Sequence, residues 1–532
     1  MRRMASPRSH GVILAPILLI GAVFSQTLDF DLCFDDRALF GESVSPSPTP
    51  EAPGSPAFPK ADTGLHTSAS SSLLQPFRTD FWGIATRRDA PANSPYYRPV
   101  SALFIVLERS EVGDLASIRA IHTALFILAV CLLFITLLRL APGVPPVHAA
   151  IGCSLFALAP WGPDIVLFLS SVGDLLALDF ALVAMIALSL FLETEKGRWL
   201  ALHSVAALLA MLSKETAYPL PIVSLVLYLH SRRRLTKLKE VGLFMASTLP
   251  LLAVLVARAV VLKTGSIAVS DTLVNLPWAL GAALRYTLLP YPPVMEVSGN
   301  GGPLWAICGG GFSAFILLYL VRSPRRINPL RVAAALWLIL LTPALFAAAA
   351  SHLFAPRYLF APFIGVALGM TYLLGRLSPR ARAVADTASR SADPIRVIRL
   401  SARLGLIAVL CLETWIMINR TVSWRDGMTL WSVELGENPT SLTAHLNLGN
   451  LLAEQGREQE ALAVMLRTID LADEHHRPCQ AAAAALNASN LLISIAPARV
   501  RPLLEKQKDR CPRLDPVIRA RLDALTQIRR AR

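Results

Sequence analysis

Long apolar segments, separated by short polar ones, constrain this chain more than any other feature. Its mean hydropathy is +0.51 and only 17% of its residues are charged, whereas soluble domains carry about 25%. A membrane span needs about 20 apolar residues. The sequence predicts an all-α, polytopic membrane protein with about eleven spans, which begin near Gly11, Ala120, Val147, Asp174, Trp199, Tyr218, Val241, Pro303, Val332, Tyr358 and Leu404.

The net charge of +14 follows the same arrangement. The basic clusters precede the first apolar segment or lie between later ones, at residues 2–8, 232–239, 322–331 and 376–403. A chain with eleven spans and a cytoplasmic N-terminus places all four clusters on one side, which is the positive-inside pattern. We therefore expect membrane lipid, and no nucleic acid, as the partner of the basic residues.

The first apolar segment has two interpretations. Arg2, Arg3 and Arg8 precede a run that ends at Phe24, as in a secretory signal. Cleavage would leave ten spans. The run has no clear cleavage site of small residues and leads directly into an acidic segment, so retention as a span is favoured.

The chain divides into a transmembrane domain, residues 1–419, and a soluble domain, residues 420–532. The transmembrane domain carries a long outer loop at 28–118, and the Pro- and Ser-rich part of this loop, 43–72, is expected to be a flexible insertion. Aromatic residues interleaved with Arg and Asp, in Thr79-Asp80-Phe81-Trp82-Gly83 and Pro95-Tyr96-Tyr97-Arg98-Pro99, are typical of short helices at the membrane interface.

The soluble domain has the composition of tetratricopeptide-type helix pairs on the outer side. Leu448-Gly449, Gly456 and Ala461 satisfy the packing needs of such a pair, although its aromatic positions are missing. A plain α-helical hairpin is the alternative. Cys479 and Cys511 could form a disulfide in an oxidising compartment, while Cys131, Cys153, Cys308 and Cys411 lie in apolar segments.

Ionisable residues gather at the predicted outer ends of the spans. Residues of this kind at membrane depth are costly and usually functional, although each alone has a structural explanation: a lysine extends to the interface, and an aspartate caps a helix. Together they suit a carboxylate base beside an anion-binding group. The candidates are Asp35 and Asp36 as base, and Arg98, Asp164, Asp174, Lys214, Glu215, Arg357 and Tyr358 around a lipid-linked phosphate.

The ordered motifs resemble those of a known family, the transmembrane and tetratricopeptide-repeat O-mannosyltransferases of the GT-C superfamily of integral-membrane glycosyltransferases. The motifs, with the C-terminal helical unit, are Phe34-Asp35-Asp36-Arg37, Asp80-Phe81-Trp82-Gly83, Tyr97-Arg98-Pro99, Leu155-Phe156-Ala157-Leu158 with Pro160 and Asp164, Asp174-Leu175-Leu176, Leu212-Ser213-Lys214-Glu215 and Arg357-Tyr358-Leu359 with Pro362.

This resemblance implies an inverting transfer of sugar from a polyprenyl-phosphate donor to a hydroxyl of a protein or glycan, at the outer face of a multi-pass membrane protein. It implies Asp35, or Asp36, as base, and Arg98, Lys214 and Arg357 as ligands of the donor phosphate. The short repeat array fits a bacterial relative, in the inner membrane. The family's His-Pro-x-His is here replaced by Ala159-Pro160-Trp161-Gly162, so the donor sugar and the acceptor are not assigned.

Three alternatives stay open on the sequence. A non-enzymatic scaffold would present the repeat domain to protein partners. A transporter for lipid-linked sugar would carry polar residues near mid-membrane and internal repeats, and an oligosaccharide ligase is a close relative of the transferase. Acidic pairs also bind Mg²⁺ or Mn²⁺, so a divalent metal is neither required nor excluded.

Overall fold

The computed structural model describes residues 11–40, 74–85, 95–231, 233–262, 269–298, 302–322, 328–377 and 394–531. The predicted insertion at 43–72 and the basic residues before Gly11 lie outside them. The described chain is almost entirely helical and forms two compact units. Unit 1 takes its described residues from Met1–Asp29, Asp35–Tyr291 and Gly299–Thr421, and unit 2 from Phe30–Phe34, Pro292–Ser298 and Val422–Arg532.

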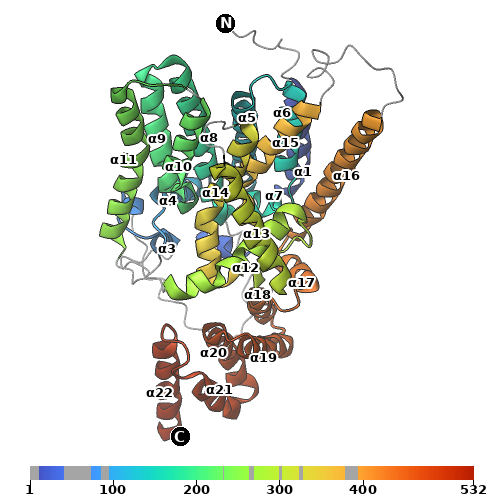
Figure 1. Cartoon of the computed structure of the whole chain (residues 1–532). Coiled ribbons are helices and arrows are strands. Elements are labelled where there is room, and N and C mark those ends of the chain that lie inside the picture. Colours follow the sequence, from blue (N-terminus) through green and yellow to red (C-terminus); the bar gives the residue numbers. More distant parts are fainter. Residues whose placement is uncertain are drawn as a thin grey trace. The chain divides into compact units, whose positions relative to one another are not determined.

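Unit 1 is a helical assembly (Figure 1). Its helices are α1 (Leu14–Phe24), α2 (Asp35–Phe40), α3 (Phe81–Ala85), α4 (Pro99–Leu107), α5 (Leu115–Leu140), α6 (Pro146–Ala157), α7 (Gly162–Val166), α8 (Val172–Thr194), α9 (Gly197–Ser213), α10 (Leu220–Ser231), α11 (Lys237–Val261), α12 (Val269–Leu288), α13 (Gly302–Val321), α14 (Pro329–Ser351), α15 (Phe363–Leu377) and α16 (Pro394–Ser423). Strand β2 is Leu353–Phe354.

Six described helical segments are long and apolar enough to cross a membrane. They are Leu115–Leu140, Leu169–Thr194, Lys237–Val261, Pro303–Val321, Pro329–Ser351 and Arg403–Ser423. Four apolar segments are shorter: Gly11–Thr27, Pro146–Ala157, Gly197–Ser213 and Phe363–Leu377. These helices fit an integral membrane protein, and the number of eleven spans stays a prediction.

Side-chain caps and prolines fix where several helices begin. The Asp114 carboxylate accepts a hydrogen bond of 2.8 Å from the Ser117 backbone at the start of α5, and the Asn328 side chain caps α14 in the same way. Pro146 opens α6, where the missing N–H of proline costs nothing. Such caps satisfy backbone groups that a helix end leaves without partners.

Helices α8 to α11 form two consecutive hairpins, and this connectivity positions several charged residues. Helix α8 packs on α9 and α10, and α11 packs on α9. Helix α8 begins near Asp174 and α9 returns to end at Ser213, so Asp174 and Lys214 lie at one end of their hairpin. Helix α10 then leads away from that end and α11 returns to it, which brings Arg258 to the same end.

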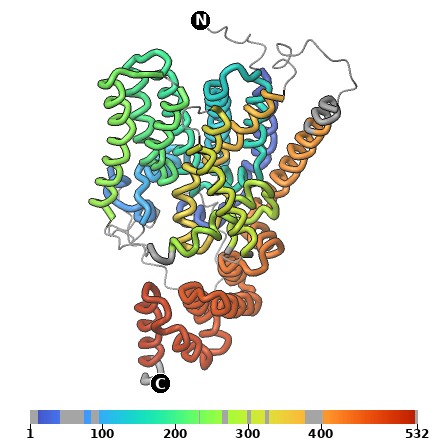
Figure 2. The backbone as a smooth tube through the Cα atoms, viewed as in Figure 1, coloured from blue at the N-terminus to red at the C-terminus, as the bar shows by residue number. Residues whose placement is uncertain are grey.

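Unit 2 is a series of helices, each packed on the next (Figure 2). They are α17 (Gly427–Glu437), α18 (Leu442–Glu454), α19 (Glu458–Glu474), α20 (Pro478–Ile495), α21 (Val500–Gln507) and α22 (Asp515–Ala531). Gly456 turns the chain between α18 and α19 with a φ of 75°, a left-handed conformation that favours glycine. The assignment of these pairs to the tetratricopeptide class stays a prediction.

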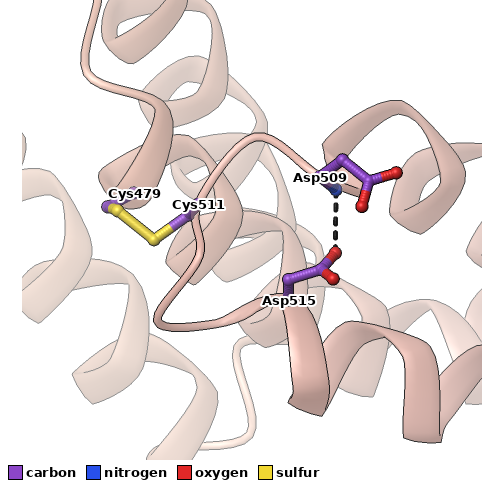
Figure 3. The surroundings of a disulfide bond; sticks show 4 residues. All are labelled: Cys479, Asp509, Cys511 and Asp515. Atoms are coloured by element: carbon purple, nitrogen blue, oxygen red, sulfur yellow. Dashed lines mark hydrogen bonds between the residues drawn. A yellow bond between two sulfur atoms is a disulfide. The ribbon is translucent and has the colours of Figure 1, made fainter.

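A disulfide links Cys479 at the start of α20 to Cys511 in the turn before α22 (Figure 3). In the same turn, the backbone N–H of Asp509 donates a hydrogen bond of 2.8 Å to the Asp515 carboxylate. The disulfide that the sequence permitted is therefore confirmed, and it fixes the approach of the chain to its last helix.

Two segments from elsewhere in the sequence complete unit 2. The Asp31 N–H donates to the Arg425 carbonyl at 2.9 Å. The Met295 N–H donates to the Glu434 carboxylate at 2.8 Å, two residues before the short strand β1 (Val297–Ser298). The sequence did not predict that residues 30–34 and 292–298 would pack with the C-terminal helices.

Candidate active site

Asp35 and Asp36 open the short helix α2, but their side chains have different surroundings. Asp36 is only 1% exposed. Its carboxylate accepts hydrogen bonds from the backbone N–H of Leu169 at 2.8 Å and of Ser170 at 2.7 Å, and from the Ser170 hydroxyl at 2.5 Å. These donors lie just before α8, where helix N–H groups favour an anion. Asp36 is therefore fixed in place.

Asp35 is half-buried and accepts no hydrogen bond from any residue that the structure describes. Burial raises the pKa of Asp35 to about 7, the negative charge of Asp36 adds to the rise, and the positive charge of Arg357 opposes it. Burial also raises the pKa of Asp36, to about 6, against the hydrogen bonds from Ser170 and Leu169 and the charge of Arg119. A carboxyl with a pKa near 7 and no hydrogen-bond donor is suited to accept a proton at neutral pH.

Ion pairs connect the other charged residues. The Lys214 ammonium donates to the Asp174 carboxylate, and Arg98 donates to Glu215 at 2.9 Å. Burial lowers the pKa of Lys214 despite Asp174, and the positive charges of Arg98 and Arg357 lower it further. Since those charges act on Lys214, the three cations share one electrostatic environment.

Arg357 lies within electrostatic range of both Asp35 and Lys214. Its guanidinium lies 5.4 Å from the centre of the Phe168 ring and 5.9 Å from the centre of the Tyr358 ring, distances at which a cation is attracted to an aromatic face. Tyr358 in turn packs edge-on against Phe354. These rings contact the guanidinium, whose charge acts on both Asp35 and Lys214.

An apolar groove begins at these charges. Asp174, Arg357 and Tyr358 line its polar part. Its apolar walls come from α8, α10, α14 and α15 and the segment before α15: Ala177, Leu178, Ala181, Met185, Leu220, Leu340, Ala361 and Ile364. The chemistry of this lining, a cation at Arg357 beside apolar side chains of α8, suits an anionic head group that carries an apolar chain.

Asp164, one of the candidates for the donor-phosphate site, forms a buried ion pair with Arg420. Its carboxylate accepts a hydrogen bond of 2.8 Å from Arg420, with side-chain exposures of 2% and 1%. Asp164 is not among the described residues that line the groove. The structure therefore places Asp164 in a buried ion pair with Arg420 and outside the lining of the groove.

The sequence analysis missed several residues of this site. Arg258, at the end of an apolar helix, lies 3.7 Å from the Glu215 carboxylate. Arg258 could have been found by the criterion that identified Lys214, namely a cation at the outer end of a predicted span. Ser170 had no signal, because its contact with Asp36 joins residues 134 positions apart. Tyr96, whose ring centre lies 4.4 Å from the Arg98 guanidinium, was noted only as an interfacial aromatic residue.

Comparisons of the chain with protein-family models, with curated proteins and with solved structures give no match. Among the described residues, no group of three or more His, Cys, Asp or Glu side chains is placed to hold a metal ion. The geometry of this site and the sequence motifs are therefore the basis for a functional assignment.

Proposed function

We propose that this protein is a GT-C-type glycosyltransferase that moves a sugar from a polyprenyl-phosphate donor to a hydroxyl acceptor. The observation that carries the proposal is the position of Arg357. This cation acts electrostatically on Asp35, the carboxyl with a pKa of about 7, and also lines the apolar groove. The proposed base, the proposed anion site and the apolar groove thus have one residue in common, Arg357.

The proposed reaction is a single inverting displacement. Asp35 accepts the proton of the acceptor hydroxyl as its oxygen attacks the anomeric carbon of the sugar. The bond from that carbon to the phosphate oxygen breaks, and the polyprenyl phosphate leaves with the electron pair. Arg357 and Lys214 stabilise its charge, Asp174 orients Lys214 through their ion pair, and Asp36 holds the first turn of α2.

The orientation of the chain is part of the proposal. The basic segments between apolar helices favour a cytoplasmic N-terminus, and the Cys479–Cys511 disulfide favours an oxidising compartment for unit 2. We propose that the charged site faces the outer side, as in a bacterial inner membrane, and that the acceptor is a protein or glycan, which unit 2 would help to hold as a repeat domain.

Transfer assays with purified protein test the assignment directly. Radiolabelled polyprenyl-phosphate hexoses serve as donors, and product is counted in the protein and glycan fractions. We expect Asp35→Asn to abolish transfer and Asp29→Asn, which removes an exposed carboxylate six residues earlier, to leave it unchanged. Equal activity in the two variants would contradict the proposal.

A scaffold function makes a different prediction for the same protein. A scaffold gives no reason for Lys214 and Arg357 to share one electrostatic environment. Binding of a polyprenyl-phosphate sugar that is weaker in Arg357→Gln than in wild type, but kept after removal of residues 425–532, supports the enzyme. Absence of donor binding both in Arg357→Gln and after removal of residues 425–532 would favour the scaffold.

A further inference from the structure

The acidic segment passes from one unit of the protein to the other within two residues. Phe30–Phe34 belongs to unit 2, and Asp35 is the first residue of the next stretch of unit 1. The position of Asp35 is therefore limited on one side by the hydrogen bonds of Asp36 and on the other by the packing of Phe34.

Phe34 is held by the first helix of unit 2. Its ring packs edge-on against Trp431 of α17, with ring centres 5.2 Å apart. Trp431 is 1% exposed, and a buried aromatic pair of this geometry is stabilising. The contact lies one residue away from the candidate base.

The backbone at Phe34 is also unusual. Its φ is 54°, in the left-handed region that non-glycine residues rarely adopt. Such a conformation persists only where the surrounding packing holds it. Nearby, the Cys33 thiol donates to the Trp424 carbonyl at 3.6 Å, and the Asp31 N–H donates to Arg425. Three contacts within unit 2, at residues 31, 33 and 34, thus precede Asp35.

Helix α17 holds a second segment in the same manner. Its Glu434 is 1% exposed and both carboxylate oxygens accept from the Met295 N–H. The Asn438 amide, just after the helix, donates to the Glu296 carbonyl at 3.0 Å. One helix therefore organises two segments that are far from it in the sequence.

We infer that Trp431, through its contact with Phe34, is a positioning residue for Asp35, the next residue along the chain. This inference rests on the proposed function where it concerns catalysis. The placement of residue 35 by Trp431 is independent of that function and can be measured alone.

The first experiment measures placement in the full chain. A thiol is introduced as Asp35→Cys in a Cys33→Ser background, and its rate of reaction with a membrane-impermeant maleimide is followed, with the Cys33→Ser protein as blank. Trp431→Ala should increase the rate about tenfold, the ratio expected when loss of an aromatic pair loosens a local contact. Trp431→Phe should keep the parent rate, and so should Trp415→Ala, which removes an exposed tryptophan from α16.

Phe34→Ala tests the same contact from the other side and leaves the core of unit 2 intact, which covers the case in which Trp431→Ala fails to fold. It should increase the labelling rate by the same factor, and the double variant should increase it no further. A labelling rate equal to the parent's in Phe34→Ala would overturn the inference.

The second experiment measures transfer with Asp35 in place. Trp431→Ala should lower kcat by about 10²-fold, as misplacement of a catalytic group by about 1 Å does, with little change in the KM for the donor. The midpoint of the acid limb of the pH profile should also move below pH 7. Burial is the main cause of the raised pKa of Asp35, and a displaced Asp35 should be less buried. A loss of folded protein would lower activity without moving this midpoint, and an unmoved midpoint would overturn the catalytic part.

The two proposals can fail separately. Faster labelling in Trp431→Ala, together with no sugar transfer by the wild-type protein, would retain the positioning role and reject the transferase. Transfer that depends on Asp35, with labelling rates and pH midpoint unchanged in Trp431→Ala, would retain the transferase and reject the positioning role.

Discussion

Arg420 donates a hydrogen bond of 2.8 Å to the carboxylate of Asp164, and the two side chains are 1% and 2% exposed. Removal of one partner of a buried ion pair leaves an uncompensated charge, which costs about 3–5 kcal/mol. We expect Asp164→Leu or Arg420→Met alone to lower the free energy of unfolding by that amount, measured by denaturant titration in detergent micelles.

The double variant distinguishes a structural role from donor binding. If the pair is structural, Asp164→Leu with Arg420→Met should regain most of the lost stability, because replacing both charges by apolar side chains is often neutral. Donor affinity should stay at the wild-type level. A stable double variant that no longer binds polyprenyl-phosphate sugar would restore Asp164 to the phosphate site.

The pH dependence of transfer should report the ionisation of Asp35. The base must be deprotonated, so kcat/KM should rise with pH and reach half its maximum near pH 7, where burial places the pKa of Asp35. Arg357→Gln removes a charge that lowers this pKa, so the midpoint should move to higher pH. A midpoint near pH 4, the ordinary range of a carboxyl, would exclude Asp35 as the base.

The pH dependence of the free energy of unfolding should reflect the same raised pKa of Asp35. The pKa of Asp35 is about 7 when folded and 3.8 as its ordinary value, so between these values the folded state binds more protons. Its contribution to stability therefore falls as pH rises through this window. Asp35→Asn should raise the melting temperature at pH 8 relative to wild type and have little effect at pH 4. A lower melting temperature at pH 8 would contradict this assignment.

The contrast between local and long-range signals explains what the sequence could predict. Apolar segments and their charged ends are local features, so the helical membrane character and the common placement of Lys214 and Arg357 could be expected. The hydrogen bonds from Ser170 to Asp36 and the packing of Phe34 on Trp431 join residues that are distant in the sequence. No local sequence pattern predicts such contacts. For that reason the sequence could not separate Asp35 from Asp36, or recognise the ion pair of Asp164.

Gly173 allows the first turn of α8 to approach its neighbours closely. A Cβ at this position would lie 2.8 Å from the Ser101 hydroxyl and 3.1 Å from the Ser213 carbonyl, which are themselves hydrogen-bonded at 2.7 Å. Gly173→Ala should therefore push Ser101 or the end of α9 away and disturb the neighbouring Asp174–Lys214 pair. We expect the KM for the donor to rise by about tenfold or more, with Gly197→Ala, where a Cβ meets nothing within 4 Å, as the control.

The apolar groove makes a prediction about the length of the lipid. Ala181 lines the groove on α8, seven residues after Asp174. A larger side chain there should obstruct the path of a polyprenyl chain and leave the charged end open. Ala181→Phe should therefore raise the KM for a long-chain polyprenyl-phosphate sugar and leave that for a short-chain analogue unchanged.

The matched control for this variant is Leu128→Phe on α5, where the side chain is 45% exposed and does not line the groove. Because a bulky residue in the groove acts on the lipid chain alone, the pH midpoint of transfer should be the same in Ala181→Phe as in wild type. An equal rise in KM for short and long donors would indicate that Ala181→Phe disturbs Arg357 itself, and the groove would then lose its role as the lipid channel.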